Sequence, residues 1–172
     1  AWTIGDVCTD MKTAEYIVDL TSGFLTPVLL PAVTFITAAI ISFSTGSSWA
    51  TMSILVPVTV PMSIQLMGGD GNQVVQDPIF LSTFAGVLSG SVFGDHCSPI
   101  SDTTILSSTA TGSDHIDHVR TQLPYAVISG VVALLAGYIF TGLGITLIVS
   151  LSVGLILVIG VLKIFGKPIL HE

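Results

Sequence analysis

Two aspartates, Asp95 and Asp102, lie in a polar segment that interrupts an otherwise apolar part of the chain. The segment, residues 90–104, also contains a histidine, a cysteine, several serines and Pro99. Lipid offers no water to such groups, so within a membrane they must face protein or a water-filled cavity. An ionisable residue at membrane depth indicates a functional site. The segment is therefore the first candidate for chemistry.

The side chains of this segment suit a hard cation such as Na⁺, which takes oxygen ligands. Asp95 and Asp102 offer carboxylates. Burial favours the protonated form of a carboxylate and a bound cation favours its ionised form, so either aspartate could exchange a proton for Na⁺. His96 is a second candidate for proton transfer near neutral pH. Four hydroxyls are further candidate ligands: those of Ser98, Ser101, Thr103 and Thr104.

A helix that is broken inside the membrane would position these groups. Pro99 lacks a backbone donor and cannot sit in a helix interior without breaking it, and Gly94 allows a turn just before Asp95. A break exposes unpaired carbonyls at one half-helix end and unpaired N–H groups at the other. The macrodipole favours a cation at the carbonyl end, and transporters place binding sites at such helices. We expect a broken helix over residues 79–110, unwound over residues 90–104.

A second break, residues 44–49, is rich in hydroxyls and carries no charge. It could be an ordinary loop, or it could complete the same site with neutral ligands. The candidate ligands there are Thr45, Gly46, Ser47 and Ser48.

The apolar runs on either side of this second break, within residues 23–67, can be built in two ways. Both arms could span the membrane, with the break as a surface loop. Alternatively Pro31, Pro57 and Pro61 mark the ends of arms of about 13 residues, which are about 20 Å long and shorter than the ~30 Å hydrocarbon core. We favour the second interpretation, a re-entrant hairpin whose tip is buried in protein.

Simpler roles compete with the functional ones. Asp102 or Asp95 could cap the following half-helix, and His96 could be a hydrogen-bonding strut. A cluster of acids and histidines at residues 114–118 has a spacing that could hold a metal, but a solvated loop explains it better. Small residues that recur every fourth position let another helix approach closely; here they are Gly86, Gly90 and Gly94.

The composition places the chain in a membrane. Of its 172 residues 51% are hydrophobic and 9% are charged, whereas a soluble domain carries roughly 25% charged residues. The length suffices for about five or six membrane segments of about 20 residues. Four Lys and Arg residues leave no basic surface for nucleic acid. We therefore expect an all-α, polytopic membrane protein whose first partner is the lipid bilayer.

The remaining segments complete the expected topology. Residues 1–22 are interpreted as an interfacial connector and residues 124–141 and 145–162 as transmembrane helices. Residues 111–123 are interpreted as a polar loop, in which Ser113 or Asp114 can cap a short interfacial helix. Lys163 and Lys167 place the C-terminus in the cytoplasm, which predicts a multi-pass protein of the cell (cytoplasmic) membrane. The chain opens on Ala-Trp without an initiating Met, so we expect a missing N-terminal part.

Two motifs resemble the C-terminal half of an NhaC-type Na⁺/H⁺ antiporter. They are Ser-Thr-Gly-Ser-Ser-Trp-Ala-Thr at residues 44–51 and Gly-Asp-His-Cys-Ser-Pro-Ile-Ser-Asp-Thr-Thr-Ile-Leu-Ser-Ser at residues 94–108. The run His-Val-Arg-Thr-Gln-Leu-Pro-Tyr-Ala at residues 118–126 and the opening Ala-Trp resemble that family too. The resemblance covers roughly residues 1–140.

The resemblance implies one inverted-repeat half of a secondary transporter of the ion transporter superfamily, with a re-entrant hairpin and a discontinuous transmembrane helix. It implies exchange of Na⁺ for H⁺, in some members coupled to small organic acids or amino acids. Na⁺ and protons would be cargo, with no resident cofactor. The N-terminal half of the same transporter and a second copy of the chain are candidate partners. The implied site consists of Asp95, His96, Ser98, Asp102 and Thr103, with the tip from Thr45 to Ser48.

Four functions compete on the sequence alone. The leading one is antiport of cytoplasmic Na⁺ for external H⁺ by alternating access, with Asp95 and Asp102 sharing the proton and the Na⁺. The alternative is Na⁺- or H⁺-coupled transport of a small organic acid or amino acid. An enzyme is disfavoured because no G-x-S-x-G or H-E-x-x-H motif is present. A structural membrane subunit is the fourth.

Overall fold

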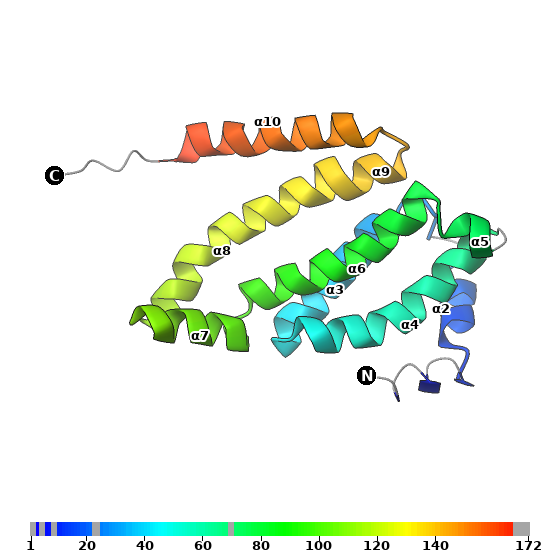
Figure 1. Cartoon of the computed structure of the whole chain (residues 1–172), viewed down its shortest axis with the longest axis horizontal. Coiled ribbons are helices and arrows are strands. Elements are labelled where there is room, and N and C mark those ends of the chain that lie inside the picture. The colour runs from blue at the N-terminus through cyan, green and yellow to red at the C-terminus, as the bar shows by residue number, and fades with distance from the viewer. Residues whose placement is uncertain (1–2, 4–5, 8–9, 22–24, 69–70, 167–172) are drawn as a thin grey trace.

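A computed structural model describes residues 3, 6–7, 10–21, 25–68 and 71–166 (Figure 1). Over these ranges the chain is helical and contains no strand. The expected features at Ala1, Trp2 and Lys167, and part of the connector at residues 1–22, lie outside the described residues. The all-helical fold class is confirmed for the part of the chain that the structure covers.

The helices follow one another with short connections. Their bounds are α2 Thr13–Thr21, α3 Leu30–Thr45, α4 Ser48–Met67, α5 Gly71–Val74, α6 Pro78–Cys97, α7 Asp102–Thr111, α8 His115–Val132, a π-helix η1 at Ala133–Ile139, α9 Phe140–Gly142 and α10 Leu147–Phe165. The helix runs without interruption from α8 through η1 to α9. Among the described residues, three helices are long and apolar enough to cross a membrane: Ser48–Met67, His115–Gly142 and Leu147–Ile164.

Local chemistry explains where several of these helices begin and end. Asp77 caps α6 by accepting a hydrogen bond from the backbone N–H of Ile79 (2.7 Å), and Asp114 caps α8 by accepting from Ile116 (2.9 Å). Such caps satisfy N–H groups that have no partner within the helix. Gly46 ends α3 with φ 65°, a left-handed conformation that favours glycine.

Two expectations about proline are wrong. Pro57 and Pro61 do not end a short arm, because α4 continues through both to Met67. Pro124 does not begin its helix either, because Asp114 caps α8 and the helix starts at His115. Residues 115–123, expected as a loop, therefore form the first turns of α8. A proline inside a membrane helix is tolerated where neighbouring helices and polar groups satisfy the freed backbone.

Helices α3 and α6 form the tightest contact of the fold, and they lie along one another in Figure 1. The glycines of the predicted small-residue face make this approach possible. A Cβ at Gly90 would lie 2.4 Å from the Phe35 carbonyl oxygen, and one at Gly94 would lie 2.2 Å from that of Ala39. The packing role of this face is confirmed. Gly94 is thus needed for close approach and does not form the flexible turn that we expected.

Hydroxyl groups and a stacked tyrosine add to this contact. The Ser42 hydroxyl donates to the Ser91 carbonyl (2.5 Å), so α3 and α6 are also joined through polar groups. The Tyr138 ring, in η1, stacks on Phe35 with ring centroids 4.9 Å apart, and its hydroxyl hydrogen-bonds to that of Ser89 in α6. The long helix that contains α8 and η1 is thereby attached to the α3–α6 pair.

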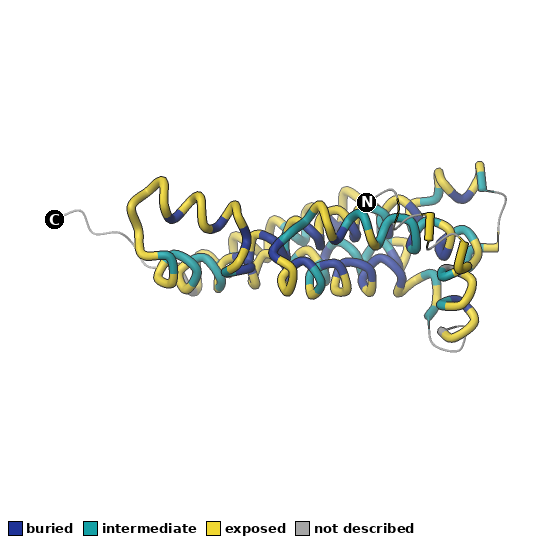
Figure 2. Tube along the Cα trace, turned by 90° about the horizontal axis from the view of Figure 1, so that it is seen from below, coloured by how far each residue is buried: buried dark blue, intermediate teal, exposed yellow. Residues whose placement is uncertain are grey.

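The buried residues gather along the middle of the molecule, and the outer surfaces of the helices are exposed (Figure 2). Helix α10 exposes most of its apolar side chains. It contacts the rest of the chain through α8, η1 and α9, and the Ser150 hydroxyl donates to the Ala136 carbonyl of η1. Apolar helices with exposed apolar surfaces suit lipid or further transmembrane segments as neighbours.

Candidate functional site

Four helix ends meet where the two polar breaks come together. The tip between α3 and α4 lies against the break between α6 and α7, because a Cβ at Gly46 would lie 3.0 Å from the Ile100 carbonyl oxygen. In Figure 1 the tip and the break are neighbours, and the α7–α8 turn lies farther to the left. The two breaks, 50 residues apart in sequence, therefore form one polar region in an apolar molecule.

Asp95 is the buried carboxylate of this region, whereas Asp102 is exposed. Asp95 lies in the last turn of α6 and is 8% exposed. Its carboxylate accepts a hydrogen bond from the Ser101 hydroxyl at 2.7 Å and one from the Ser48 hydroxyl at 3.3 Å. Ser101 is the N-cap of α7 and Ser48 is the first residue of α4. The carboxylate therefore sits at the positive ends of two helices, which favour a negative charge.

The partners of Asp95 are neutral. A hydroxyl can donate to a carboxylate, and its oxygen can also turn towards a cation. The Ser101 oxygen lies 2.8 Å from that of Thr103, so the hydroxyls extend from the buried carboxylate to the exposed start of α7. A buried carboxylate needs a charge partner or a proton. The region therefore combines a negative charge, several oxygens and no basic group bonded to the carboxylate.

The unwound segment is shorter than expected. We expected residues 90–104 to be unwound, but only residues 98–101 lie between α6 and α7. Asp95 is helical, and Ser98 is the first residue with extended backbone (φ −74°, ψ 129°). A residue before a proline is disfavoured in the helical region, so Pro99 explains this position of the break.

The other predicted site residues divide into buried and exposed groups. Ser98 is fully buried; its N–H donates to the Asp95 carbonyl (3.0 Å) and its hydroxyl accepts from the Ile100 N–H (3.4 Å). Thr104 is buried in α7, and Ser47 is half-buried and caps α4 through the Ala50 N–H (3.3 Å). The exposed residues are His96, Asp102, Thr103 and Thr45.

The exposed side chains are not bonded to the Asp95 carboxylate. His96 follows Asp95 on the helix, and consecutive helical residues point about 100° apart. Asp102 is the first residue of α7, where a negative charge is favoured by the helix dipole. The N-cap position is taken by Ser101, so Asp102 does not cap this helix. The structure thus brings Asp95, Ser48 and Ser101 together, and neither the His96 side chain nor the Asp102 side chain hydrogen-bonds to the Asp95 carboxylate.

Two residues of α8 that contact the break were missed from the sequence. The Nε2 atom of His115 lies 2.7 Å from the Pro99 carbonyl oxygen, and the Gln122 amide donates to the His96 carbonyl. We had interpreted His115 as part of a solvated polar cluster. Their spacing of seven residues, two helical turns on one face, is the signal that could have found them. Over the described ranges, no group of three or more His, Cys, Asp or Glu could hold a metal.

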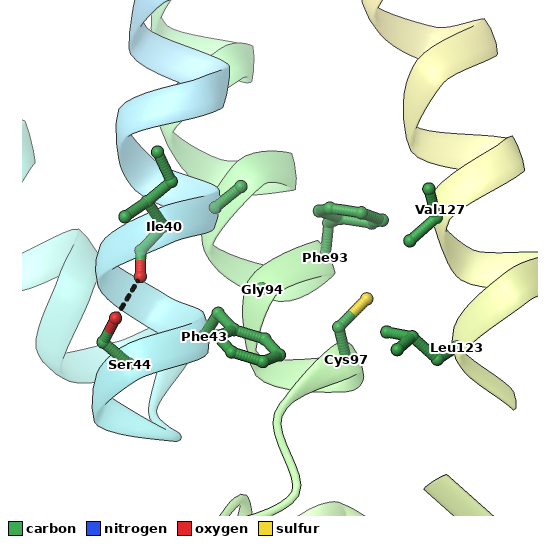
Figure 3. Close-up of a pocket in the computed structure, with 9 residues that line it drawn as sticks. Ile40, Phe43, Ser44, Phe93, Gly94, Cys97, Leu123 and Val127 are labelled. Carbon is green, nitrogen blue, oxygen red and sulfur yellow. Dashed lines mark hydrogen bonds between the residues drawn. The ribbon is translucent and has the colours of Figure 1, made fainter. Parts of the chain in front are cut away.

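An apolar pocket of about 250 Å³ lies beside the break, between α3, α6 and α8 (Figure 3). Phe43, Phe93, Cys97 and Leu123 point into it. The hydroxyl of Ser44 is turned back to the Ile40 carbonyl of its own helix (2.8 Å). The residues that line the pocket carry no charge, whereas the polar region around Asp95 contains a carboxylate.

The described residues include three helices able to span a membrane and a buried carboxylate at a helix break, which are features of integral membrane proteins and typical of transporters. The chain belongs to the Na⁺/H⁺ antiporter family, whose family model matches residues 1–143. The resemblance to NhaC-type antiporters is confirmed, because the Na⁺/H⁺ antiporter NhaC of Alkalihalophilus pseudofirmus is 31% identical over 67% of this chain and 24% of its own length.

Two further relatives extend the comparison. An uncharacterized protein of Haemophilus influenzae is 40% identical over 95% of this chain and 30% of that protein. The arginine/ornithine antiporter ArcD of Halobacterium salinarum is 34% identical over 73% of this chain and 24% of that protein. The chain thus spans less than a third of the length of these relatives. No solved structure matches it.

Proposed function

We propose that this chain supplies the cation site of a multi-pass secondary transporter of the cell membrane, which exchanges cytoplasmic Na⁺ for external H⁺ by alternating access. The observation that carries the proposal is the Asp95 carboxylate, which is buried at a helix break and whose hydrogen-bond donors among the described residues are the neutral hydroxyls of Ser48 and Ser101. An isolated buried charge is costly. Either a proton or a Na⁺ ion relieves that cost, and their competition for one carboxylate couples the two movements.

The oxygens around Asp95 form a reasonable ligand set for Na⁺. Hard cations take carboxylate, hydroxyl and carbonyl oxygens, and here Ser48 and Ser101 lie within hydrogen-bonding distance of the carboxylate. Asp102 and Thr103 are exposed at the start of α7. In the proposed transporter, the N-terminal half of the same protein covers this exposed face and adds the remaining ligands.

The proposed placement in the membrane keeps α3 and α4 as a re-entrant hairpin. Its support is the length of α3, 16 residues, or about 24 Å against a hydrocarbon core of ~30 Å. Its tip meets the α6–α7 break and falls short of the α7–α8 turn (Figure 1). Helix α4 is itself long enough to span, so the proposal rests on α3 and on the position of the tip. Lys163 and Arg120 then face the cytoplasm.

A second candidate is exchange of an amino acid or a small organic acid, coupled to Na⁺ or H⁺. The relative ArcD is named as an arginine/ornithine antiporter. The first turns of α4 and α7 both begin at the polar region, and N–H groups at a helix N-terminus can bind a carboxylate. In this version the same tip binds the substrate carboxylate next to the cation.

Proton movement in vesicles that contain the complete transporter tests the proposal. A Na⁺ pulse, applied without any organic solute, is expected to drive protons across the membrane, as recorded with a pH-sensitive dye. Movement that appears only when arginine, ornithine or a small organic acid is present would favour the second candidate. Vesicles in which neither condition moves protons would refute both.

Replacing Ser101 by alanine is expected to raise the Na⁺ concentration for half-maximal exchange more than Ser48→Ala does. The Ser101 bond to Asp95 is shorter and fully buried. A hydrogen bond to a charged group contributes about 1.5–3 kcal/mol, so we expect roughly a tenfold change for Ser101→Ala. Ser107→Ala is the matched control, because the exposed Ser107 hydroxyl donates only to the Thr103 carbonyl of its own helix. Equal half-maximal concentrations for Ser101→Ala and Ser107→Ala would contradict this assignment.

A further inference from the structure

Helix α8 makes two side-chain hydrogen bonds to backbone oxygens at the α6–α7 break. The Gln122 amide donates to the carbonyl of His96, in the last turn of α6. The His115 ring reaches the carbonyl of Pro99, inside the break (2.7 Å). The two residues lie seven positions apart on α8, which is close to two turns and places them on one face.

We propose that His115 and Gln122 are positioning residues for the cation site, which hold the unwound residues 98–101 in the geometry that Asp95 requires. The proposal rests on the proposed function of Asp95. It assigns an indirect role to α8, because the two residues bond to the backbone of the break and not to the cation. Ser98, between the two bonded carbonyls, and Ser101, at the end of the break, are both fully buried. We call His115 and Gln122 the α8 clamp.

The backbone of the break explains why such a clamp is needed. The last four carbonyls of a helix have no partner within the helix, and an unbonded carbonyl in an apolar region costs free energy. Without α8, the His96 and Pro99 carbonyls could turn towards the cation or towards water. The clamp engages both carbonyls, which fixes the orientation of the peptide groups between them. The Ser101 hydroxyl can then reach Asp95 at 2.7 Å.

The chemistry of the His115 ring fits this role. A carbonyl oxygen only accepts hydrogen bonds, so Nε2 must carry the proton that points to Pro99. The Nδ1 atom lies 3.1 Å from the Ser108 hydroxyl at the end of α7. The ring is half-buried and connects the break to the last turn of α7. A displacement of α8 relative to α6 would therefore move the break and the α7 helix together.

Hydrogen–deuterium exchange and Na⁺ kinetics, measured on the complete transporter, test the clamp. In His115→Ala and Gln122→Ala the backbone amides of residues 98–104 are expected to exchange about tenfold faster, while those of residues 83–91 do not change. The half-maximal Na⁺ concentration is expected to rise about five- to tenfold, the factor for one lost hydrogen bond of ordinary strength. The maximal rate should change much less, because Asp95 itself is intact.

Two further variants keep the test decisive. His115→Gln retains an N–H donor that can reach the Pro99 carbonyl, so it is expected to restore most of the Na⁺ affinity and to cover the case that His115→Ala does not fold. Thr121→Ala is the matched control, because the exposed Thr121 hydroxyl donates only to carbonyls of its own helix, those of Asp117 and His118.

The outcomes are distinguishable. If hydrogen–deuterium exchange at residues 98–104 is as slow in His115→Ala and Gln122→Ala as in Thr121→Ala, the clamp is refuted. Faster hydrogen–deuterium exchange with an unchanged Na⁺ affinity would overturn the role of the clamp in positioning the site. A wild-type protein that moves no Na⁺ would instead refute the proposed function. The hydrogen–deuterium exchange rates would still decide whether α8 holds the break.

Discussion

Replacing Asp95 by asparagine is expected to abolish Na⁺-dependent proton movement. Asparagine keeps the size of the side chain and can accept from the Ser101 and Ser48 hydroxyls, but it has neither a proton to release nor a charge to attract Na⁺. Because both cargo ions would use this carboxylate, the loss should exceed 100-fold, on the scale of removing an essential charged group. The measurement is dye-reported proton movement after a Na⁺ pulse.

Asp102→Asn is the matched control for this prediction. It makes the same chemical change at the other aspartate of the motif, which is exposed at the first turn of α7. A favourable charge at a helix N-terminus contributes only about 0.3–1 kcal/mol, so exchange should fall less than about fivefold. Full exchange in a folded Asp95→Asn protein would contradict the assignment. A greater loss in Asp102→Asn than in Asp95→Asn would move the site to Asp102.

Replacing Gly94 by alanine is expected to destabilise the protein more than any other single methyl group added to α6. The new Cβ would lie 2.2 Å from the Ala39 carbonyl oxygen and 2.8 Å from the Phe43 nitrogen, both of which are backbone atoms that cannot rotate away. Overpacking of this kind costs about 1–3 kcal/mol and sometimes more. We expect the upper end of that range, and a clear fall in the melting temperature of the detergent-purified protein.

Gly137→Ala provides the comparison for Gly94→Ala. Gly137 is also helical, but a Cβ there would meet no atom within 4 Å. The melting temperature of the Gly137→Ala protein should stay near that of the wild type, because alanine has a higher helix propensity than glycine. If Gly94→Ala and Gly137→Ala melted at the same temperature, the close backbone contact between α3 and α6 would not be a source of stability.

The sequence was sufficient to predict a helical membrane protein and the location of its polar region. Charged groups are so expensive in lipid that Asp95 and Asp102 stood out from their apolar surroundings, but only the structure shows that Asp95 is buried and Asp102 exposed. Pro99 correctly indicated a break, yet Pro57, Pro61 and Pro124 did not produce one. The physical difference lies in tertiary contacts. At Pro99, Ser101 turns back to bond with Asp95 and His115 bonds to the freed backbone, and no local pattern reports such pairings.

The extent of the unwound segment and the direction of the side chains were less predictable. His96 stands next to Asp95 in sequence but is exposed, whereas Ser48, 47 positions away, donates to the carboxylate. Adjacency along the chain is a poor guide here, because a helix sends neighbouring side chains in different directions. The residues of α8 were missed for a related reason. Asp114 was predicted as a possible cap of a short interfacial helix, but its cap begins the long helix α8 instead.

The glycine face between α3 and α6 has a mechanical consequence for transport. Where two helices touch backbone to backbone, neither can slide or roll without a collision, so α3 and α6 behave as a single stiff body. The tip follows one of these helices and the break follows the other, so each is anchored to that body at one end. An ion bound at Asp95 would be carried between fixed walls, and the change of access would have to come from whatever surface slides past this body from outside.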